Sequence, residues 1–196
     1  MKAKDRRLKN LIDKKAKVPE KILISGAFCV IMWRVMDKIC TFTGNRPNKL
    51  PWGYDERDPR CVAVKALLRE QVKRAIDDGY NKFVCGMALG ADFYFAEAVL
   101  YFKKSHNVIL ECALPYHGQA DKWSESFMQR HAGILDEADV ITVVSERYTP
   151  YCMHARNRYM VDKSSRIISL CYTDSGGAFT TTEYAKRKGL EVICIK

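Results

Sequence analysis

Residues 84–98 have the sequence VCGMALGADFYFAEA, which joins a short apolar run to an alanine-rich helical pattern through a turn with two glycines. Glycine has no side chain, so a phosphate can approach the backbone N–H groups of such a turn and the positive end of the following helix. A second turn of this kind occurs at residues 175–183, with the sequence SGGAFTTTE. Two glycine turns that open helices predict a site for an anionic ligand, with a nucleotide as the first expectation.

The rest of the chain repeats this alternation of strands and helices. Apolar runs rich in Val, Ile, Phe and Cys predict strands at 38–43, 82–85, 108–113, 139–144, 166–171 and 191–195. Helical patterns lie between them, at about 58–78, 91–105, 119–133, 153–164 and 177–188. Several runs are apolar without alternation, which is typical of parallel strands buried on both faces. We therefore predict an α/β fold, a Rossmann-like three-layer sandwich with a mostly parallel sheet of about six strands.

The basic charge of the chain is concentrated at its N-terminus. Residues 1–35 hold ten of the 33 Lys and Arg but three of the 23 Asp and Glu, so the remainder has a net charge of only +3. The whole-chain charge of +10 is therefore a weak indication of a nucleic-acid partner. We predict two parts, an extension at 1–35 and one domain at 36–196. For the extension, a misassigned start at Met36 and an accessory or membrane-surface helix both remain open.

The eight cysteines do not have the spacing of a metal site. No C-x-x-C occurs, and five of the eight lie in or beside apolar runs that predict strands. Cysteine used as a small buried apolar residue is typical of a reducing compartment. We expect a cytoplasmic protein with no metal, no cofactor and no membrane partner.

In a parallel sheet of this kind, ligands bind beyond the carboxyl ends of the strands. The loops after the predicted strands, and the helices that follow them, therefore supply the candidate ligand-binding residues. Gly44 permits a tight turn, Arg46 could reach a phosphate, and Tyr116 could stack on a base. The full set is Thr43, Gly44, Asn45, Arg46, Gly86, Ala88, Gly90, Asp92, Tyr116, Arg156, Asn157, Ser175, Gly176, Gly177, Thr180 and Thr181.

Two charged candidates also have simpler interpretations. Asp92 could bind a ribose hydroxyl, or it could cap the helix that begins beside it. Arg156 stands near the start of a predicted helix, where the helix dipole disfavours a cation unless a ligand or a carboxylate compensates it. An exposed ion pair with Glu146 is the alternative. At helical spacing Met153, Asn157 and Met160 share a face, with Arg156 beside them.

The glycine turns match neither of two common nucleotide motifs. No Gly-Lys-Ser/Thr follows the second turn, so it is not a Walker loop, and residues 86–90 are not a G-x-G-x-x-G.

Four motifs in order resemble the YpsA-like branch of the SLOG superfamily, across essentially all of 36–196. They are Thr43-Gly44-x-Arg46-Pro47, Gly86-x-Ala88-x-Gly90-x-Asp92, the string RNRYMVD at 156–162, and Gly176-Gly177-x-x-Thr180-Thr181.

This resemblance implies a Rossmann-like fold in a bacterial or phage protein that binds or senses a nucleotide-derived small molecule. Superfamily members often dimerise, so the resemblance also suggests a homo-oligomer. The superfamily includes the LOG phosphoribohydrolases, whose catalytic Arg and Glu correspond to Arg156 and Glu183 here. A LOG-like cleavage of a nucleoside monophosphate is therefore one alternative, although Ser175, Phe179 and Asn157 depart from the LOG pattern. A second alternative is single-stranded DNA binding like that of DprA, another member.

Overall fold

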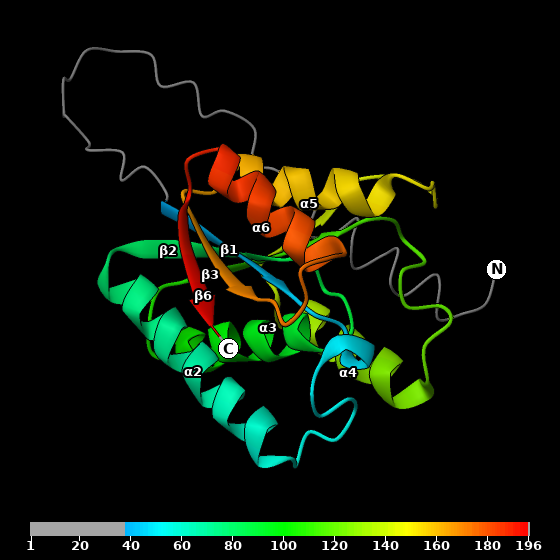
Figure 1. The fold of residues 1–196 in the computed structure, drawn as a ribbon, viewed down its shortest axis with the longest axis horizontal. Helices are drawn as coiled ribbons and strands as arrows, with labels where there is room; N and C mark the ends of the chain where they lie inside the picture. The colour runs from blue at the N-terminus through cyan, green and yellow to red at the C-terminus, as the bar shows by residue number, and fades with distance from the viewer. Residues whose placement is uncertain (1–37, 196) are drawn as a thin grey trace, which may run out of the picture.

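The computed structural model describes residues 38–195 and contains a six-stranded parallel sheet between two layers of helices (Figure 1). The strands are β1 (Lys38–Gly44), β2 (Tyr80–Cys85), β3 (Ile109–Leu114), β4 (Val140–Val143), β5 (Arg166–Leu170) and β6 (Glu191–Ile195). They lie in the order β4-β3-β2-β1-β5-β6, and every neighbouring pair is parallel. The predicted α/β class and six-stranded parallel sheet are confirmed.

The helices follow the strands along the chain. They are α2 (Pro59–Asp77), α3 (Ala91–Lys103), α4 (Glu125–Glu137), α5 (Cys152–Asp162) and α6 (Gly177–Arg187), with a 3-10 turn η1 (Pro47–Lys49) after β1. Helices α2, α3 and α4 cover one face of the sheet, and α5 and α6 cover the other (Figure 1). Gly79 after α2 and Gly189 after α6 have φ of +86° and +77°, the left-handed conformation in which a glycine commonly ends a helix.

The core is unequal on the two faces of the sheet. The large cluster under α2, α3 and α4 contains Phe42, Phe83 and Phe95, and the Phe42 and Phe95 rings stack with centroids 4.8 Å apart. Under α5 and α6 two smaller clusters form around Met160 and Val161. The apolar runs of the inner strands β1, β2, β3 and β5 are thus buried on both sides, as their lack of alternation predicted.

One helix prediction was wrong at both ends. The pattern at 119–133 predicted a helix, but α4 begins at Glu125 and ends at Glu137. Residues 118–123 instead form turns, closed by bonds from Asp121 N to Gly118 O and from Trp123 N to Ala120 O. The side chain of Gln119 is buried in this segment and bonds to the carbonyls of residues 86 and 87. That tertiary contact takes priority over helix propensity.

The strand order places the ends of β1 and β5 at the point where the winding of the chain reverses. From β1 the chain proceeds outward through β2 and β3 to β4, and then returns to β5 on the other side of β1. Loops leaving neighbouring strands in opposite directions at such a point leave a crevice between them, and ligands bind there in open α/β sheets. Residues 1–37 lie outside the described part, so the prediction for the extension at 1–35 receives no structural account.

Candidate functional site

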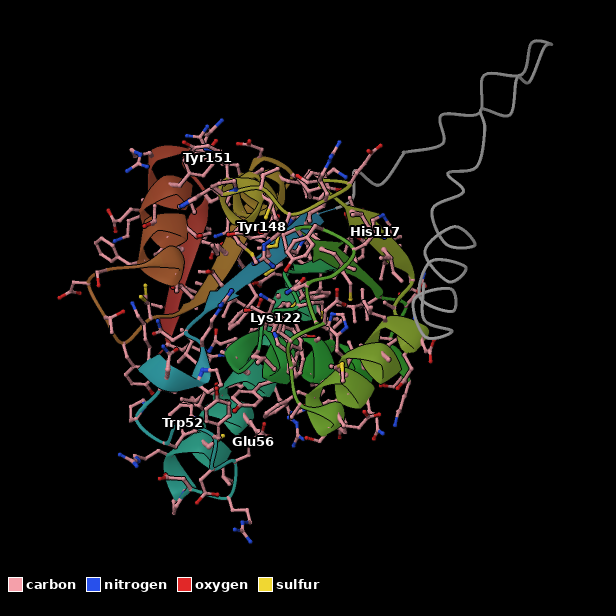
Figure 2. All side chains as sticks on the ribbon, turned by 90° about the vertical axis from the view of Figure 1, so that its right-hand side faces the viewer. Trp52, Glu56, His117, Lys122, Tyr148 and Tyr151 are labelled. Carbon is pink, nitrogen blue, oxygen red and sulfur yellow. The ribbon has the colours of Figure 1, made fainter. Side chains whose placement is uncertain are left out.

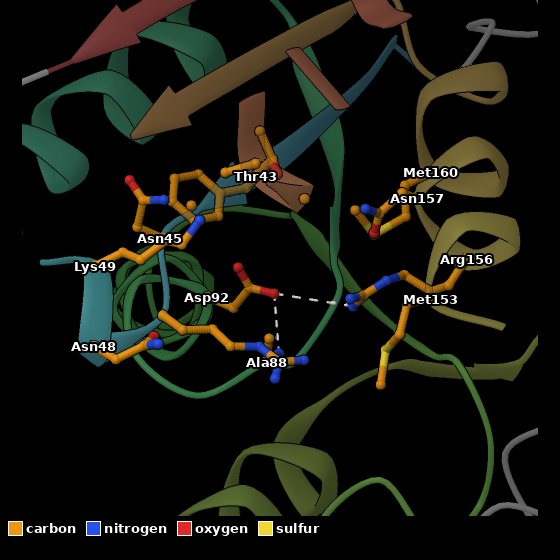
Figure 3. A pocket seen from close by; sticks show the side chains of 15 residues that line it. Thr43, Asn45, Asn48, Lys49, Ala88, Asp92, Met153, Arg156, Asn157 and Met160 are labelled. Carbon is orange, nitrogen blue, oxygen red and sulfur yellow. Dashed lines mark hydrogen bonds and ion pairs between the residues drawn. The ribbon is translucent and has the colours of Figure 1, made fainter. Parts of the chain in front are cut away.

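A cavity of about 200 Å³ lies at this crossing, beyond the carboxyl end of β1 (Figure 3). Its walls come from the end of β1, from η1, from the turn before α3, from one side of α5 and from the start of α6. The lining residues are Phe42, Thr43, Gly44, Asn45, Arg46, Asn48, Lys49, Ala88, Asp92, Met153, Arg156, Asn157, Met160, Gly177 and Ala178. Five segments far apart in sequence therefore meet around one space.

Arg156 is the buried cation of this cavity, with only 5% of its surface exposed. It projects from the second turn of α5 (Figure 3), and its Nη1 donates a hydrogen bond to the carbonyl of Gly86. Its Nε has no hydrogen-bond partner among residues 38–195. Burial lowers the pKa of Arg156, and nearby Asp92 only partly offsets this. A buried guanidinium with an unused donor is a binding group for an oxyanion.

Asp92 is the carboxylate that faces Arg156 across the cavity. Its Oδ2 lies 3.9 Å from Arg156 Nη1 and accepts a hydrogen bond from Ala88 N at 3.0 Å (Figure 3). Burial raises the pKa of Asp92, while Arg156 and the Ala88 N–H act in the opposite direction. Asp92 therefore compensates Arg156, as the helix-dipole argument required of some partner. It closes the preceding turn and does not cap α3, whose N-cap residue is Gly90.

The turn at residues 86–90 is packed against other side chains. A Cβ on Gly86 would overlap the Arg156 guanidinium, and one on Gly90 would lie 2.9 Å from Pro47 Cδ. Gln119 Nε2 donates to Met87 O at 2.7 Å and to Gly86 O at 3.3 Å. Met87 itself has φ of +56°, an uncommon conformation for a residue with a side chain. This turn is held in one shape by contacts from three other segments.

The turn before α6 is open by contrast. Gly176 is the N-cap with φ of +90°, and the helix start has no side-chain cap. A Cβ on Gly177 would meet nothing within 4 Å, and Gly177 lines the cavity. Lys49 Nζ lies over this helix start, 2.6 Å from where a Cβ on Gly176 would stand, and it donates to Ser175 O at 3.4 Å. A cation and a positive helix end thus face the same space.

Cations outnumber acids in the wall of the cavity. Arg46, Lys49 and Arg156 contribute three positive charges, and Asp92 contributes the one negative charge. Because Arg156 and Asp92 are buried together, the two exposed cations are a surplus that water and salt screen only in part. The cavity is therefore electrostatically suited to an anion.

Nine predicted site residues line the cavity: Thr43, Gly44, Asn45, Arg46, Ala88, Asp92, Arg156, Asn157 and Gly177. Gly86 and Gly90 instead shape the turn behind it, and Ser175 and Gly176 shape the turn before α6. The hydroxyls of Thr180 and Thr181 donate to the carbonyls of residues 176 and 177, four positions earlier. Thr181 Oγ1 also accepts from Asn157 Nδ2 at 2.7 Å, which ties α6 to α5. The threonines thus stabilise the helix start and are not among the residues that line the cavity.

Six lining residues were not in the predicted set: Phe42, Asn48, Lys49, Met153, Met160 and Ala178. Asn48 and Lys49 belong to η1, which turns the chain back over the end of β1. The signal for η1 is Pro47, because proline is favoured at the first position of a helical turn. The sequence of residues 44–59 has many turn residues, and this signal was not distinguished from them. Met153, Met160, Asn157 and Arg156 do share the cavity side of α5.

Arg156 and Glu183, which correspond to the catalytic pair of the LOG enzymes, are not brought together in the cavity. Arg156 lines it, but Glu183 lies seven residues into α6 and pairs with Lys186 at 2.8 Å. Thr182, its neighbour, is turned toward the sheet, where it bonds to Ser169 at 2.7 Å. Glu183 is absent from the cavity wall, so among the described residues Asp92 is the carboxylate that a ligand would meet.

Two further properties concern the described part of the chain. Between residues 38 and 195 no three His, Cys, Asp or Glu side chains gather in a way that could hold a metal ion. In the same part, the helices are too short or too polar to cross a membrane.

Comparison with known proteins places the chain among uncharacterised bacterial relatives. A UPF0398 protein of Bacillus pumilus (strain SAFR-032) is 26% identical over 144 residues, which cover 72% of this chain and 77% of that protein. The uncharacterized SPbeta prophage-derived protein YoqJ of Bacillus subtilis (strain 168) is 27% identical over 148 residues, 67% of this chain and 85% of that protein.

A likeness to a solved structure concerns the fold. The X-ray structure of DNA processing protein A (DprA) from Streptococcus pneumoniae has a TM-score of 0.55 and 16% identity to this chain. The match covers 82% of this chain and half the length of the DprA chain. The model of the YspA SLOG family matches residues 40–191, which run from the third residue of β1 to the first residue of β6. The chain therefore belongs to the YspA SLOG family.

Proposed function

We propose that this protein binds or senses a nucleotide or a nucleotide-derived ligand, and that it holds the ligand's phosphate in the cavity between β1, α5 and α6. The observation that carries the proposal is Arg156, a buried guanidinium on the cavity wall whose Nε has no partner in the described part of the chain. An unpaired buried donor is unfavourable, and an oxyanion in the cavity would satisfy it.

The start of α6 supports the same ligand from the opposite wall. Its first turn has no side-chain cap, Gly177 leaves open space in front of it, and Lys49 adds a positive charge. Helix N-termini bind phosphate through their free N–H groups and their dipole. Asp92 then lies where it could accept a hydrogen bond from a sugar hydroxyl.

The size of the cavity limits how much of a nucleotide it encloses. About 200 Å³ is below the roughly 300–1,000 Å³ of sites that enclose a whole drug-sized molecule. A phosphate and its sugar account for this volume, and the base would lie at the rim. The ligand class is therefore a phosphorylated ribose derivative that is held by one end.

Binding without hydrolysis is the favoured activity. A LOG-like reaction needs a carboxylate beside the glycosidic bond, and Glu183 is paired with Lys186 outside the cavity wall. We further propose a cytoplasmic location, which suits the seven free cysteines of residues 38–195. Self-association and single-stranded DNA as a partner remain proposals that rest on the family alone.

The test measures binding of ribose 5-phosphate and nucleoside 5′-monophosphates to the full chain by thermal shift and by calorimetry. A ligand at 100 times its Kd adds about 2.7 kcal/mol, which should raise the Tm by roughly 5–10 °C for a domain of this size. In Gly177→Val the new side chain enters the open cavity, so we expect Kd to rise roughly tenfold or more while the Tm of the free protein is retained.

Gly133→Val is the matched control. Gly133 in α4 also has nothing within 4 Å of its Cβ position and no positive φ, but it lies outside the cavity. We expect this variant to bind as the wild type does. If neither ribose 5-phosphate nor any nucleotide shifts the Tm, or if both valine variants weaken binding equally, the proposed phosphate site is refuted.

A further inference from the structure

Two tyrosines lie on neighbouring loops beyond the carboxyl edge of the sheet, one after β3 and one after β4. Tyr116 follows β3 and Tyr148 lies between β4 and α5, so both leave the carboxyl edge of the sheet on which the cavity opens. Their rings meet edge to face, with centroids 5.5 Å apart and an interplanar angle of 77°. Figure 2 shows Tyr148 near the middle of the face formed by these loops.

Tyr116 connects this pair of rings to the wall of the cavity. Burial raises the pKa of Tyr116, Cys152 raises it further, and Arg46 lowers it, so both residues lie within electrostatic range of the phenol. Arg46 lines the cavity, and Cys152 directly precedes Met153, which also lines it. Tyr116 therefore lies near residues of both the η1 side and the α5 side of the cavity wall.

Much of the Tyr148 side chain is exposed. Its exposed fraction is 64%, although its ring contacts Tyr116. An edge-to-face pair leaves ring faces available, and a planar heterocycle can stack on such a face. A phosphate held inside the cavity would place the base of the same nucleotide outside it, on the rim.

We infer that Tyr148, supported by Tyr116, forms the stacking surface for the base of the bound nucleotide. The inference rests on the proposed function, because it is the phosphate in the cavity that brings the base to the rim. Stacking uses the π-face that every base has, so this subsite favours an aromatic base over none and discriminates weakly among bases. Selectivity for one base would need polar groups other than these two rings.

The experiment compares two probes that share a phosphate and a ribose. Adenosine 5′-monophosphate carries a base, and ribose 5-phosphate does not. In the wild-type chain we expect the nucleotide to bind roughly tenfold more tightly, in the range of one stacked base. In Tyr148→Ala this advantage should largely disappear, with the Kd of ribose 5-phosphate unchanged, and Tyr148→Phe should keep it because the ring remains.

Tyr151→Ala is the matched control. Tyr151 is on the same loop, with 77% of its surface exposed, and it should leave both Kd values unchanged. Equal binding of both probes by the wild type, or a loss in Tyr151→Ala in place of Tyr148→Ala, overturns the base subsite but leaves the phosphate site standing. Failure of both probes to bind overturns the phosphate site and the stacking surface together.

Discussion

The two glycine turns have similar sequences but opposite surroundings. The turn at 86–90 is filled from outside, because Arg156 and Gln119 both bond to its carbonyls and Asp92 bonds to its N–H at Ala88. The turn at 176–177 has no side-chain cap, and a Cβ on Gly177 would meet nothing within 4 Å. The protein satisfies polar groups of the first turn, whereas the helix start at the second turn has no side-chain cap.

The comparison teaches that a glycine can stand before a helix for either of two physical reasons. Gly86 has no side chain because the protein's own guanidinium occupies that place. Gly177 has none although the protein leaves the place empty. The first is a packing requirement and the second is consistent with access for an external group, so substitutions at the two positions should affect different properties.

The largest expected effect is the loss of stability in Gly86→Ala. The added Cβ overlaps the buried Arg156 guanidinium, which must move away from both Gly86 O and Asp92. We expect the free energy of unfolding in urea to fall by about 3 kcal/mol, as for overpacking that also disturbs a buried ion pair. Gly177→Ala should change it by no more than about 0.5 kcal/mol.

Similar losses in both alanine variants would contradict the contrast between a filled and an open turn. A small loss in Gly86→Ala would mean that Arg156 can adopt another position without penalty. Neither glycine has a positive φ, so backbone strain does not confuse the result.

The sequence could not separate these two turns, although it predicted both. Gly86 and Arg156 are 70 residues apart, and nothing local to the turn indicates that a guanidinium will fill it. The fold was predictable because strand and helix patterns are local, and because unalternating apolar runs indicate a buried parallel sheet. The start of α4 was predicted wrongly for the same reason that Gly86 was ambiguous, since the burial of Gln119 is a tertiary contact.

The side of the cavity formed by η1 illustrates the same limit. Arg46 was a candidate from its place after β1, but Lys49 reaches the start of α6 only because η1 folds back across the strand end. Its partner Ser175 is 126 residues away along the chain. Residues that follow a strand directly are predictable members of a site, and residues brought back by a turn are not.

Gln119→Leu sharpens the comparison by removing a support of the closed turn without adding volume inside it. The buried carbonyl of Met87 loses its donor, a loss worth about 1.5 kcal/mol of unfolding free energy. The control is Gln129→Leu in α4, where the exposed amide bonds to Glu125 at 3.2 Å and where we expect a change within about 0.5 kcal/mol. Equal effects in urea unfolding would show that Gln119 does not hold the turn.

Asp92→Asn tests the electrostatics of the closed turn through pH. Burial raises the pKa of Asp92 above its ordinary value of 3.8, so near that pH the folded protein binds this proton more readily than the unfolded chain does. Its contribution to stability is fully present below pH 3.8 and is lost as the pH rises through the folded pKa. Urea unfolding between about pH 3.5 and 6.5 should therefore show the stability of the wild type falling relative to Asp92→Asn as pH increases.

Asp58 provides the control of opposite sign, because hydrogen bonds from the side chain and backbone of Arg60 lower its pKa from 3.8 to about 2. Its contribution is present above pH 3.8 and is lost as the pH falls through about 2, so the wild type should gain relative to Asp58→Asn as pH increases. Opposite slopes of this stability difference against pH would show that burial, and not a strong ion pair with Arg156, dominates the pKa of Asp92. A rising slope at both positions would mean that Arg156 stabilises the Asp92 carboxylate more than burial disfavours it. The charge of Arg156 would then be largely compensated by Asp92, and Arg156 would attract an anion more weakly.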